Sequence, residues 1–253
     1  MAHLLNRRSK TPDTATNERH VRSGLLSDFI LGSQDGIVNV LAVLLGVAAA
    51  AIQQYGSASI AFRVIVAGGL AATFGESISM GAVAYTSTLA RRDHYLSELA
   101  REEREMLEVP EVERKEVREV FQRWGFDGQE LEDAVHHICS KPRAWLEFMM
   151  AHELQLAPLE ENQARKSAAL VGFAAIFGSL IPLVPFLVFP SDIIMGMIGS
   201  LVVAAITLFV IGWYKGHMTI GRPYRSGLQM LIIGIVSAIT GFLIAYIVGA
   251  APA

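Results

Sequence analysis

The sequence contains a single cysteine, Cys139, among 253 residues. One thiol can neither close a disulfide within the chain nor supply a multi-cysteine zinc or iron–sulfur site. No Walker-type glycine pattern or nucleotide fingerprint is present, which argues against ATP as the energy source. The apolar runs also lack a His-Glu-x-x-His motif or a pair of catalytic aspartates, which argues against an intramembrane hydrolase. We therefore predict no catalytic residues, no permanent cofactor and a protein that is not an enzyme.

Charge is scarce as well. Asp, Glu, Lys and Arg make up 18% of the residues, whereas soluble domains carry about 25%. The formal net charge is −3, so the composition predicts no general attraction to nucleic acid. Apolar residues reach 52%, and almost all of the charge lies outside a few long apolar runs. This composition is typical of a membrane protein.

Five apolar segments are long enough to cross a bilayer, which takes about 20 mostly apolar residues in a helix. The second of them is long enough to project beyond the membrane on one side. The segments are Phe29–Ile52, Ile60–Ala90, Ala168–Phe189, Ile193–Tyr214 and Leu228–Ala250. We therefore expect an all-α membrane protein with five transmembrane helices and a charged insert, residues 91–166, between the second and the third.

The basic residues predict the orientation, because short cytoplasmic loops are enriched in Lys and Arg. With five spans, every basic cluster falls on one face of the membrane. The clusters are Arg7 to Arg22, Arg91 with Arg92, Arg165 with Lys166, and Lys215 to Arg225. We expect residues 1–27 to form a cytoplasmic tail, because residues 1–22 lack the apolar core of a secretory signal. Residues 28–90 and 167–253 then hold the spans, and the insert is a cytoplasmic helical metal-binding domain.

The insert is predicted to be helical throughout. No helix breaker occurs between Arg91 and Glu108, so the second span should continue into the cytoplasm. Beyond it we expect a turn at Pro110 and three further helices. These are Glu111–Trp124, closed by Gly125 and Gly128, then Gln129–Ser140 with Asp127 as its cap, and a helix that begins at Pro142 and runs to Leu156.

Two acids, Asp35 and Glu76, fall within predicted spans. A charge at membrane depth is costly, so such a residue usually faces a cavity or a pathway. Glycines next to both acids would permit close helix packing or local unwinding. Met80 shares a helix face with Glu76 because the two are four residues apart. The alternative is an interfacial Asp35, a Glu76 that hydrogen-bonds a neighbouring helix, and a Met80 that only packs.

The insert carries acids at helical spacing. Glu102 and Glu105 are three residues apart, as are Glu113 and Glu116, so each pair shares a face. The turn at Pro110 could fold the pairs together. Met149, Met150 and Glu153 lie within one turn near the end of the insert. Carboxylates alone suit Mg²⁺, Ca²⁺ or Mn²⁺, and thioether or imidazole ligands shift the preference towards Fe²⁺ and later metals. Basic residues between the acids leave an ordinary solvated helix as the alternative, and His94, His136, His137 and His152 are weaker ligand candidates.

Together these motifs resemble the vacuolar iron transporter family. The resemblance rests on Asp35-Gly36, on Glu76 to Gly81, and on the Glu-rich insert that ends in Met149-Met150-x-x-Glu153, and it spans about Arg22 to Ala250. It implies a homodimer that exchanges Fe²⁺, sometimes Mn²⁺, for protons and moves the metal out of the cytosol. It further implies that Glu102, Glu105, Glu113, Glu116, Met149, Met150 and Glu153 capture metal and that Asp35, Glu76 and Met80 line the pathway. Some relatives have a further acid deeper in the first span, where this chain offers only Asn39.

We therefore expect a proton-coupled Fe²⁺ transporter, since a carboxylate must lose its proton before it binds a metal. Mn²⁺, Zn²⁺ and Co²⁺ are alternative ions. The methionines favour iron, because Mn²⁺ gains little from thioether ligands. The rival interpretations are an Mn²⁺ transporter and a membrane-anchored metal sensor, although an anchor has no use for intramembrane acids. The expected location is a bacterial inner membrane or, alternatively, a vacuolar membrane.

Overall fold

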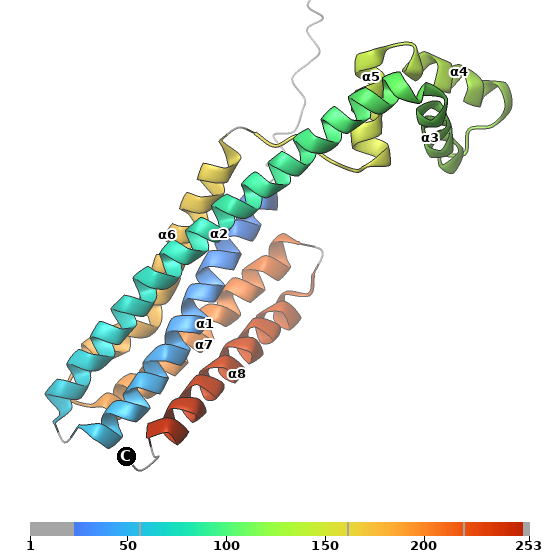
Figure 1. Ribbon diagram of the computed structural model, residues 1–253. Coiled ribbons are helices and arrows are strands. Elements are labelled where there is room, and N and C mark those ends of the chain that lie inside the picture. Colours follow the sequence, from blue (N-terminus) through green and yellow to red (C-terminus); the bar gives the residue numbers. More distant parts are fainter. Residues whose placement is uncertain (1–22, 56, 161, 220, 250–253) are drawn as a thin grey trace, which may run out of the picture.

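Five long helices lie alongside one another in a bundle (Figure 1), in a computed structural model that describes residues 23–55, 57–160, 162–219 and 221–249. They are α1 (Ser23–Gln54), α2 (Ala58–Glu108), α6 (Gln163–Val188), α7 (Ile193–Met218) and α8 (Pro223–Gly249). Each is long and apolar enough to cross a membrane. The predicted all-α fold with five spans is thereby confirmed. Residues 1–22 of the expected tail lie outside the described residues.

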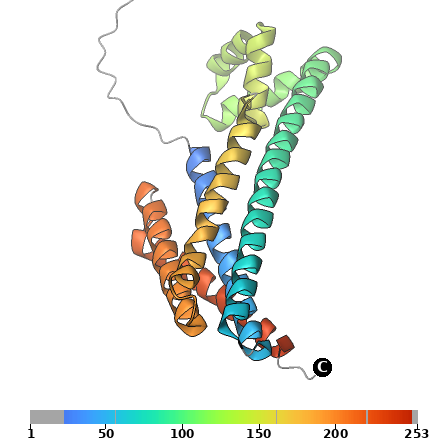
Figure 2. The same ribbon diagram turned by 90° about the vertical axis from the view of Figure 1, so that its left-hand side faces the viewer.

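The chain runs back and forth through the bundle, and the insert lies at one end of it (Figures 1 and 2). The start of α1, the start of α6 and the connection from α7 to α8 lie at this insert end. The connections from α1 to α2 and from α6 to α7 lie at the opposite end, together with the last turn of α8. The basic flanks among the described residues, Arg91 with Arg92, Arg165 with Lys166, and Lys215 with Arg222 and Arg225, therefore share one end.

Helix α1 is the centre of the bundle, because its side chains contribute to two apolar cores. On one side, Leu41 packs in a cluster with Leu208 of α7. On another, Leu44 packs with Ile65 of α2 and Phe186 of α6. The outer faces of α2, α6, α7 and α8 expose large apolar side chains along their length, as expected for surfaces that meet lipid rather than water.

The glycine beside Asp35 lets α1 and α6 pack closely. A Cβ atom built at Gly36 would collide with the carbonyl oxygen of Ala175 and lie 2.8 Å from Oγ of Ser179. Gly75, beside Glu76, has open space around its Cβ position. Both helices continue unbroken through these positions. Close packing is therefore the role of Gly36, and local unwinding does not occur at either acid.

Replacing Gly36 with Val is expected to destabilise the bundle by about 1–3 kcal/mol, the usual cost of overpacking a core. Gly75→Val is the matched control, since it makes the same substitution in a helix without a close neighbour. Thermal unfolding of the two purified variants in detergent measures the difference. Equal midpoints would contradict the close contact between α1 and α6.

The insert has its own apolar core. The insert consists of the end of α2 with α3 (Pro110–Arg123), α4 (Gly128–Cys139), α5 (Pro142–Phe148) and the π-helical turn η1 (Met149–Glu153). Their buried residues form one cluster that includes Val117, Val135, Phe148 and Met149. This core orients α3 and η1 against the end of α2, and it thereby decides which acidic side chains meet.

Two details of the predicted insert are corrected. Asp127 occupies the N-cap position of α4, but its side chain makes no cap hydrogen bond. The last helix ends at Glu153 and not at Leu156. The chain leaves it through a π turn in which the N–H of Leu154 donates to the carbonyl of Met149 over 3.0 Å, and Gln155 then has a φ of 56°. A left-handed residue cannot continue the helix.

Candidate metal sites

The first site lies within the bundle, where α1 faces α2. The amide of Asn39 donates a hydrogen bond of 3.0 Å to Oε1 of Glu76. The side chains of Asp35 and Glu76 also interact with each other, and Asp35 interacts with Asn39. Met80 is half-buried one turn beyond Glu76 on the same face of α2. The fold therefore brings together two acids and an amide, all oxygen donors suited to a divalent cation.

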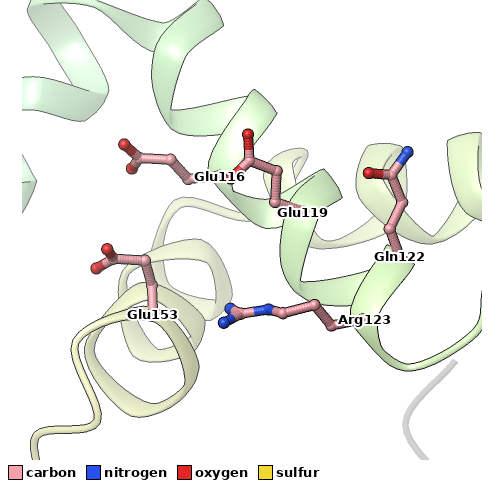
Figure 3. Close-up of a pocket in the computed structure, with 5 residues that line it drawn as sticks. All are labelled: Glu116, Glu119, Gln122, Arg123 and Glu153. Carbon is pink, nitrogen blue, oxygen red and sulfur yellow. The ribbon is translucent and has the colours of Figure 1, made fainter.

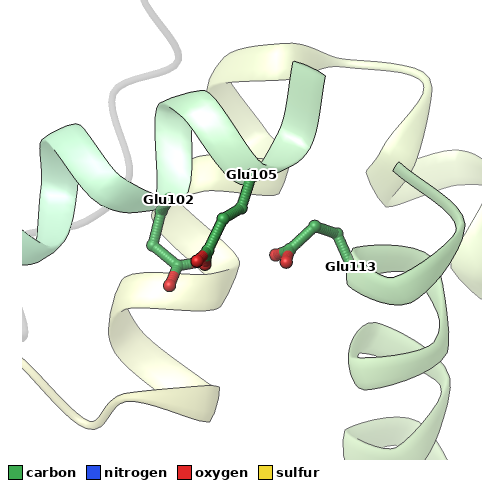
Figure 4. A group of neighbouring side chains, drawn as sticks. All are labelled: Glu102, Glu105 and Glu113. Atoms are coloured by element: carbon green, nitrogen blue, oxygen red, sulfur yellow. The ribbon is translucent and has the colours of Figure 1, made fainter. Parts of the chain in front are cut away.

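The second site lies in the insert. Carboxylate oxygens of Glu102, Glu105 and Glu113 all lie within 4.8 Å of one another. Glu102 and Glu105 come from the end of α2, and Glu113 reaches them from the first turns of α3 (Figure 4). The turn at Val109 and Pro110 reverses the chain enough for the two helices to present these side chains to the same space.

Burial makes this cluster unusual. Glu102 and Glu113 are each only 2% exposed, and Oε2 of each has no hydrogen-bond partner among the described residues. A buried carboxylate oxygen without a partner is costly and therefore calls for an explanation. Solvated acids on an ordinary helix face would be exposed, so burial argues against that alternative. The donor set fits a divalent metal ion, which would satisfy both oxygens and offset the repulsion between the carboxylates.

The charges of the cluster shift the acidity of its members. Burial, together with the charges of Glu116 and Glu102, raises the pKa of Glu113 to about 8. Burial likewise raises the pKa of Glu102, Glu116 and Glu153 above the usual value for glutamate. The charge of Glu153 also raises the pKa of Glu116. A metal ion bound at this cluster would therefore compete with protons near neutral pH.

Three further acids, Glu116, Glu119 and Glu153, line a cavity of about 610 Å³ in the insert (Figure 3). Its lining residues are Glu116, Glu119, Gln122, Arg123 and Glu153. Glu116 and Glu119 project from α3, and Glu153 lies across from them on η1. Since the charges of Glu105 and Glu116 also influence each other, the cavity and the cluster of Glu102, Glu105 and Glu113 form one acidic region.

The methionines are buried beside this region. Met149 is fully buried and belongs to the apolar core of the insert, and Met150 is 2% exposed. Among the described residues, no histidine joins the three-glutamate cluster. His152 instead packs against Trp124, edge to face, and against Phe148 at a tilted angle, with ring centroids 5.0 Å away in both cases. The packing role of Met149 is therefore established, whereas its role as a ligand stays a prediction.

Arg101 is an exposed residue that lies beside the acidic cluster. It was one of several cations that suggested a solvated helix, yet its guanidinium lies 2.9 Å from Glu98, 3.4 Å from Glu102 and 3.5 Å from Glu105. Glu119 and Arg123 line the cavity as well, although they are not among the site residues predicted from the sequence. Their spacing of three and seven residues from Glu116 places all three on one face of α3, and this pattern is visible in the sequence.

Arg101→Gln is expected to raise the affinity of the insert for a divalent metal, roughly 3- to 10-fold, because a positive charge beside the cluster repels the ion. Metal binding by full-length protein at alkaline pH measures the change. Arg104→Gln is the matched control, since Arg104 is exposed on the same helix and donates a hydrogen bond to the carbonyl of Ala100. An equal effect of both substitutions would contradict a local role for Arg101.

Comparison with known proteins gives a consistent result. A family model described as the VIT family matches residues 26–246. Vacuolar iron transporter 1 of Arabidopsis thaliana is 31% identical over 232 residues, which cover 91% of this chain and 89% of that protein. Vacuolar iron transporter 1 of Oryza sativa subsp. japonica is 32% identical over 89% of this chain and 86% of its own. The vacuolar iron transporter of Plasmodium falciparum is 29% identical over 87% of this chain and 80% of its own.

Proposed function

This chain belongs to the VIT family, and from that premise we propose that it carries Fe²⁺ across a membrane in exchange for protons. The family is one of transporters, so the chain is not an enzyme. The observation that carries the proposal is the pair of interacting acids, Asp35 and Glu76, on two neighbouring helices that are apolar and long enough to cross a membrane. Acids at membrane depth serve ion or proton pathways far more often than anchoring.

Proton exchange would follow from the chemistry of these carboxylates. Each must release its proton before it can bind a cation, so metal and H⁺ compete for the same oxygens. Asn39 can coordinate a cation through its carbonyl oxygen, but it has no proton to release. The exchange at this site would therefore use Asp35 and Glu76 as the proton-carrying groups.

The insert would load the pathway. Its buried cluster of Glu102, Glu105 and Glu113 would capture metal, and Glu116, Glu153 and the two methionines would complete the acidic region. Helix α2 joins the two sites without a break between Glu76 and Glu102. Its 51 residues correspond to roughly 75 Å at about 1.5 Å per residue, far longer than a bilayer core of about 30 Å. We propose that the insert is cytoplasmic, because the basic flanks share its end of the bundle, and that transport leads out of the cytosol.

A second copy of the chain would complete the pathway. Asp35 and Glu76 are only half-buried in one chain, and ionisable groups at membrane depth avoid contact with lipid. We propose that two copies pair over this surface of α1 and α2. Chemical cross-linking of the protein in its native membrane would yield a dimer, and a monomer alone would count against this arrangement.

Transport in proteoliposomes tests the function directly. Fe²⁺ entry would be measured together with the internal pH, under anaerobic conditions that keep the iron reduced. We expect an imposed pH gradient to drive metal uptake and metal addition to drive proton flux. Competition by Mn²⁺, Zn²⁺ and Co²⁺ would rank the ions. Uptake that ignores the pH gradient would overturn proton coupling, and a complete lack of uptake would favour a non-transporting sensor.

A further inference from the structure

A small cavity lies where α2 and α6 leave the apolar bundle at the insert end. Its volume is about 160 Å³. It is lined by Tyr85, Leu89 and Arg92 of α2 and by Asn162, Ala164 and Arg165 at the start of α6. The two helices run side by side here (Figures 1 and 2). The cavity is separate from both acidic sites described above.

Its charge is positive and unbalanced. Arg92 and Arg165 come from different helices, and neither forms an ion pair with any residue in the described part of the chain. The described residues that line the cavity include no acid. By contrast, the neighbouring Lys166 pairs with Glu160 at 3.0 Å. Two guanidinium groups on one cavity without a counter-ion favour an anion, and their planar donor forks match phosphate.

On the α2 side, the cavity lining extends from Arg92 towards the apolar span. Tyr85, Leu89 and Arg92 are separated by four and three residues, so they form one stripe along α2. This stripe begins inside the apolar span and ends at its charged border. Tyr85 is 37% exposed, and tyrosine is enriched at the level of the lipid headgroups. A ligand that follows the whole stripe needs both an anionic head and an apolar tail.

We propose that this cavity binds the phosphate headgroup of an anionic phospholipid, with an acyl chain along Tyr85 and Leu89. Basic pockets between transmembrane helices recognise such headgroups in general. The lipid would bridge α2, which continues into the insert, and α6, which returns from it. It would thereby stabilise the junction between the membrane bundle and the metal-capturing insert.

The test compares full-length wild type with Arg92→Gln/Arg165→Gln in detergent micelles. Phosphatidylglycerol, phosphatidylcholine or inorganic phosphate is added, and thermal unfolding and native mass spectrometry are measured. The control is Arg222→Gln/Arg225→Gln, which removes the same charge from the start of α8 and the residue just before it, at the same end of the bundle. We expect phosphatidylglycerol to stabilise wild type and control, and the test variant to bind it roughly tenfold more weakly or worse.

Each result decides the proposal. Arg92→Lys/Arg165→Lys keeps the charge and should retain most of the lipid binding, which separates loss of the site from loss of folding. Equal losses in the test and control variants would overturn the site in favour of general surface charge. Stabilisation by inorganic phosphate as strong as that by phosphatidylglycerol would assign the cavity to a soluble anion, and no difference between the two lipids would also overturn the proposal.

Discussion

Replacing Asp35 with Asn, or Glu76 with Gln, is expected to lower metal-dependent proton flux in proteoliposomes by roughly 100-fold or more. Each substitution keeps the size of the side chain but removes the only group at its position that can exchange a proton. Loss of an outer-shell partner alone can cost 10- to 100-fold in a metal site, so the loss of a direct oxygen ligand should cost at least as much. Glu76 also accepts the hydrogen bond of Asn39, and the amide of Gln can preserve that contact.

Asp93→Asn is the matched control for these variants. Asp93 lies on the same helix as Glu76 but is exposed and outside the apolar span, so its loss should leave the flux near the wild-type level. Thermal unfolding would verify that all variants retain their fold. Flux in both Asp35→Asn and Glu76→Gln that equals the control would remove these residues from the pathway.

The second large effect is expected in the insert. The double substitution Glu102→Gln/Glu113→Gln should weaken divalent metal binding to full-length protein by roughly 100-fold or more, because two buried carboxylates of the cluster become neutral amides. The same change should not destabilise the metal-free protein at alkaline pH, since it removes repulsion between buried charges. Opposite effects on metal affinity and on metal-free stability distinguish a binding site from a purely structural network.

The pH dependence provides an independent check on the cluster. The pKa of Glu113 is raised to about 8, first by burial, so the folded protein holds a proton that the unfolded chain releases above its ordinary pKa of 4.5. The contribution of Glu113 to metal-free stability is therefore fully present below about pH 4.5 and is lost as the pH rises towards and through about 8. Each unit of pKa shift corresponds to about 1.4 kcal/mol. The midpoint temperature of thermal unfolding of wild type should decrease as the pH is raised from about 5 to about 8.5. The midpoint of the double variant should depend less on pH.

Glu103→Gln/Glu111→Gln supplies the control for both measurements. Glu103 and Glu111 are exposed neighbours on the same two helices, and exposed charges contribute little to stability or to binding at a distance. If this control weakened metal binding as much as the Glu102 and Glu113 variant, the insert would act through its overall negative charge and not through a defined cluster.

Much of the fold could be predicted from the order of residue types. Five apolar segments at bilayer length predicted five helices, and the structure contains α1, α2, α6, α7 and α8 in those places. The absence of a breaker between Arg91 and Glu108 predicted the extension of α2. The end of η1 was predicted less well, because the π turn at Met149 and the left-handed Gln155 result from packing of the insert core and not from a local sequence signal.

The sequence by itself determined the class of the protein. Four features can be recognised in the sequence alone: long apolar segments, few charges, two acids inside apolar spans and a Glu-rich insert. Together they predict a membrane metal transporter. The tertiary structure alone decided which side chains meet. Glu113 reaches Glu102 and Glu105 only because the apolar core of the insert holds α3 against the end of α2. Arg101, by contrast, pairs with acids of its own helix, Glu98, Glu102 and Glu105, at spacings that the sequence already contains. Spacing defines the face of one helix, whereas packing between helices determines what that face contacts.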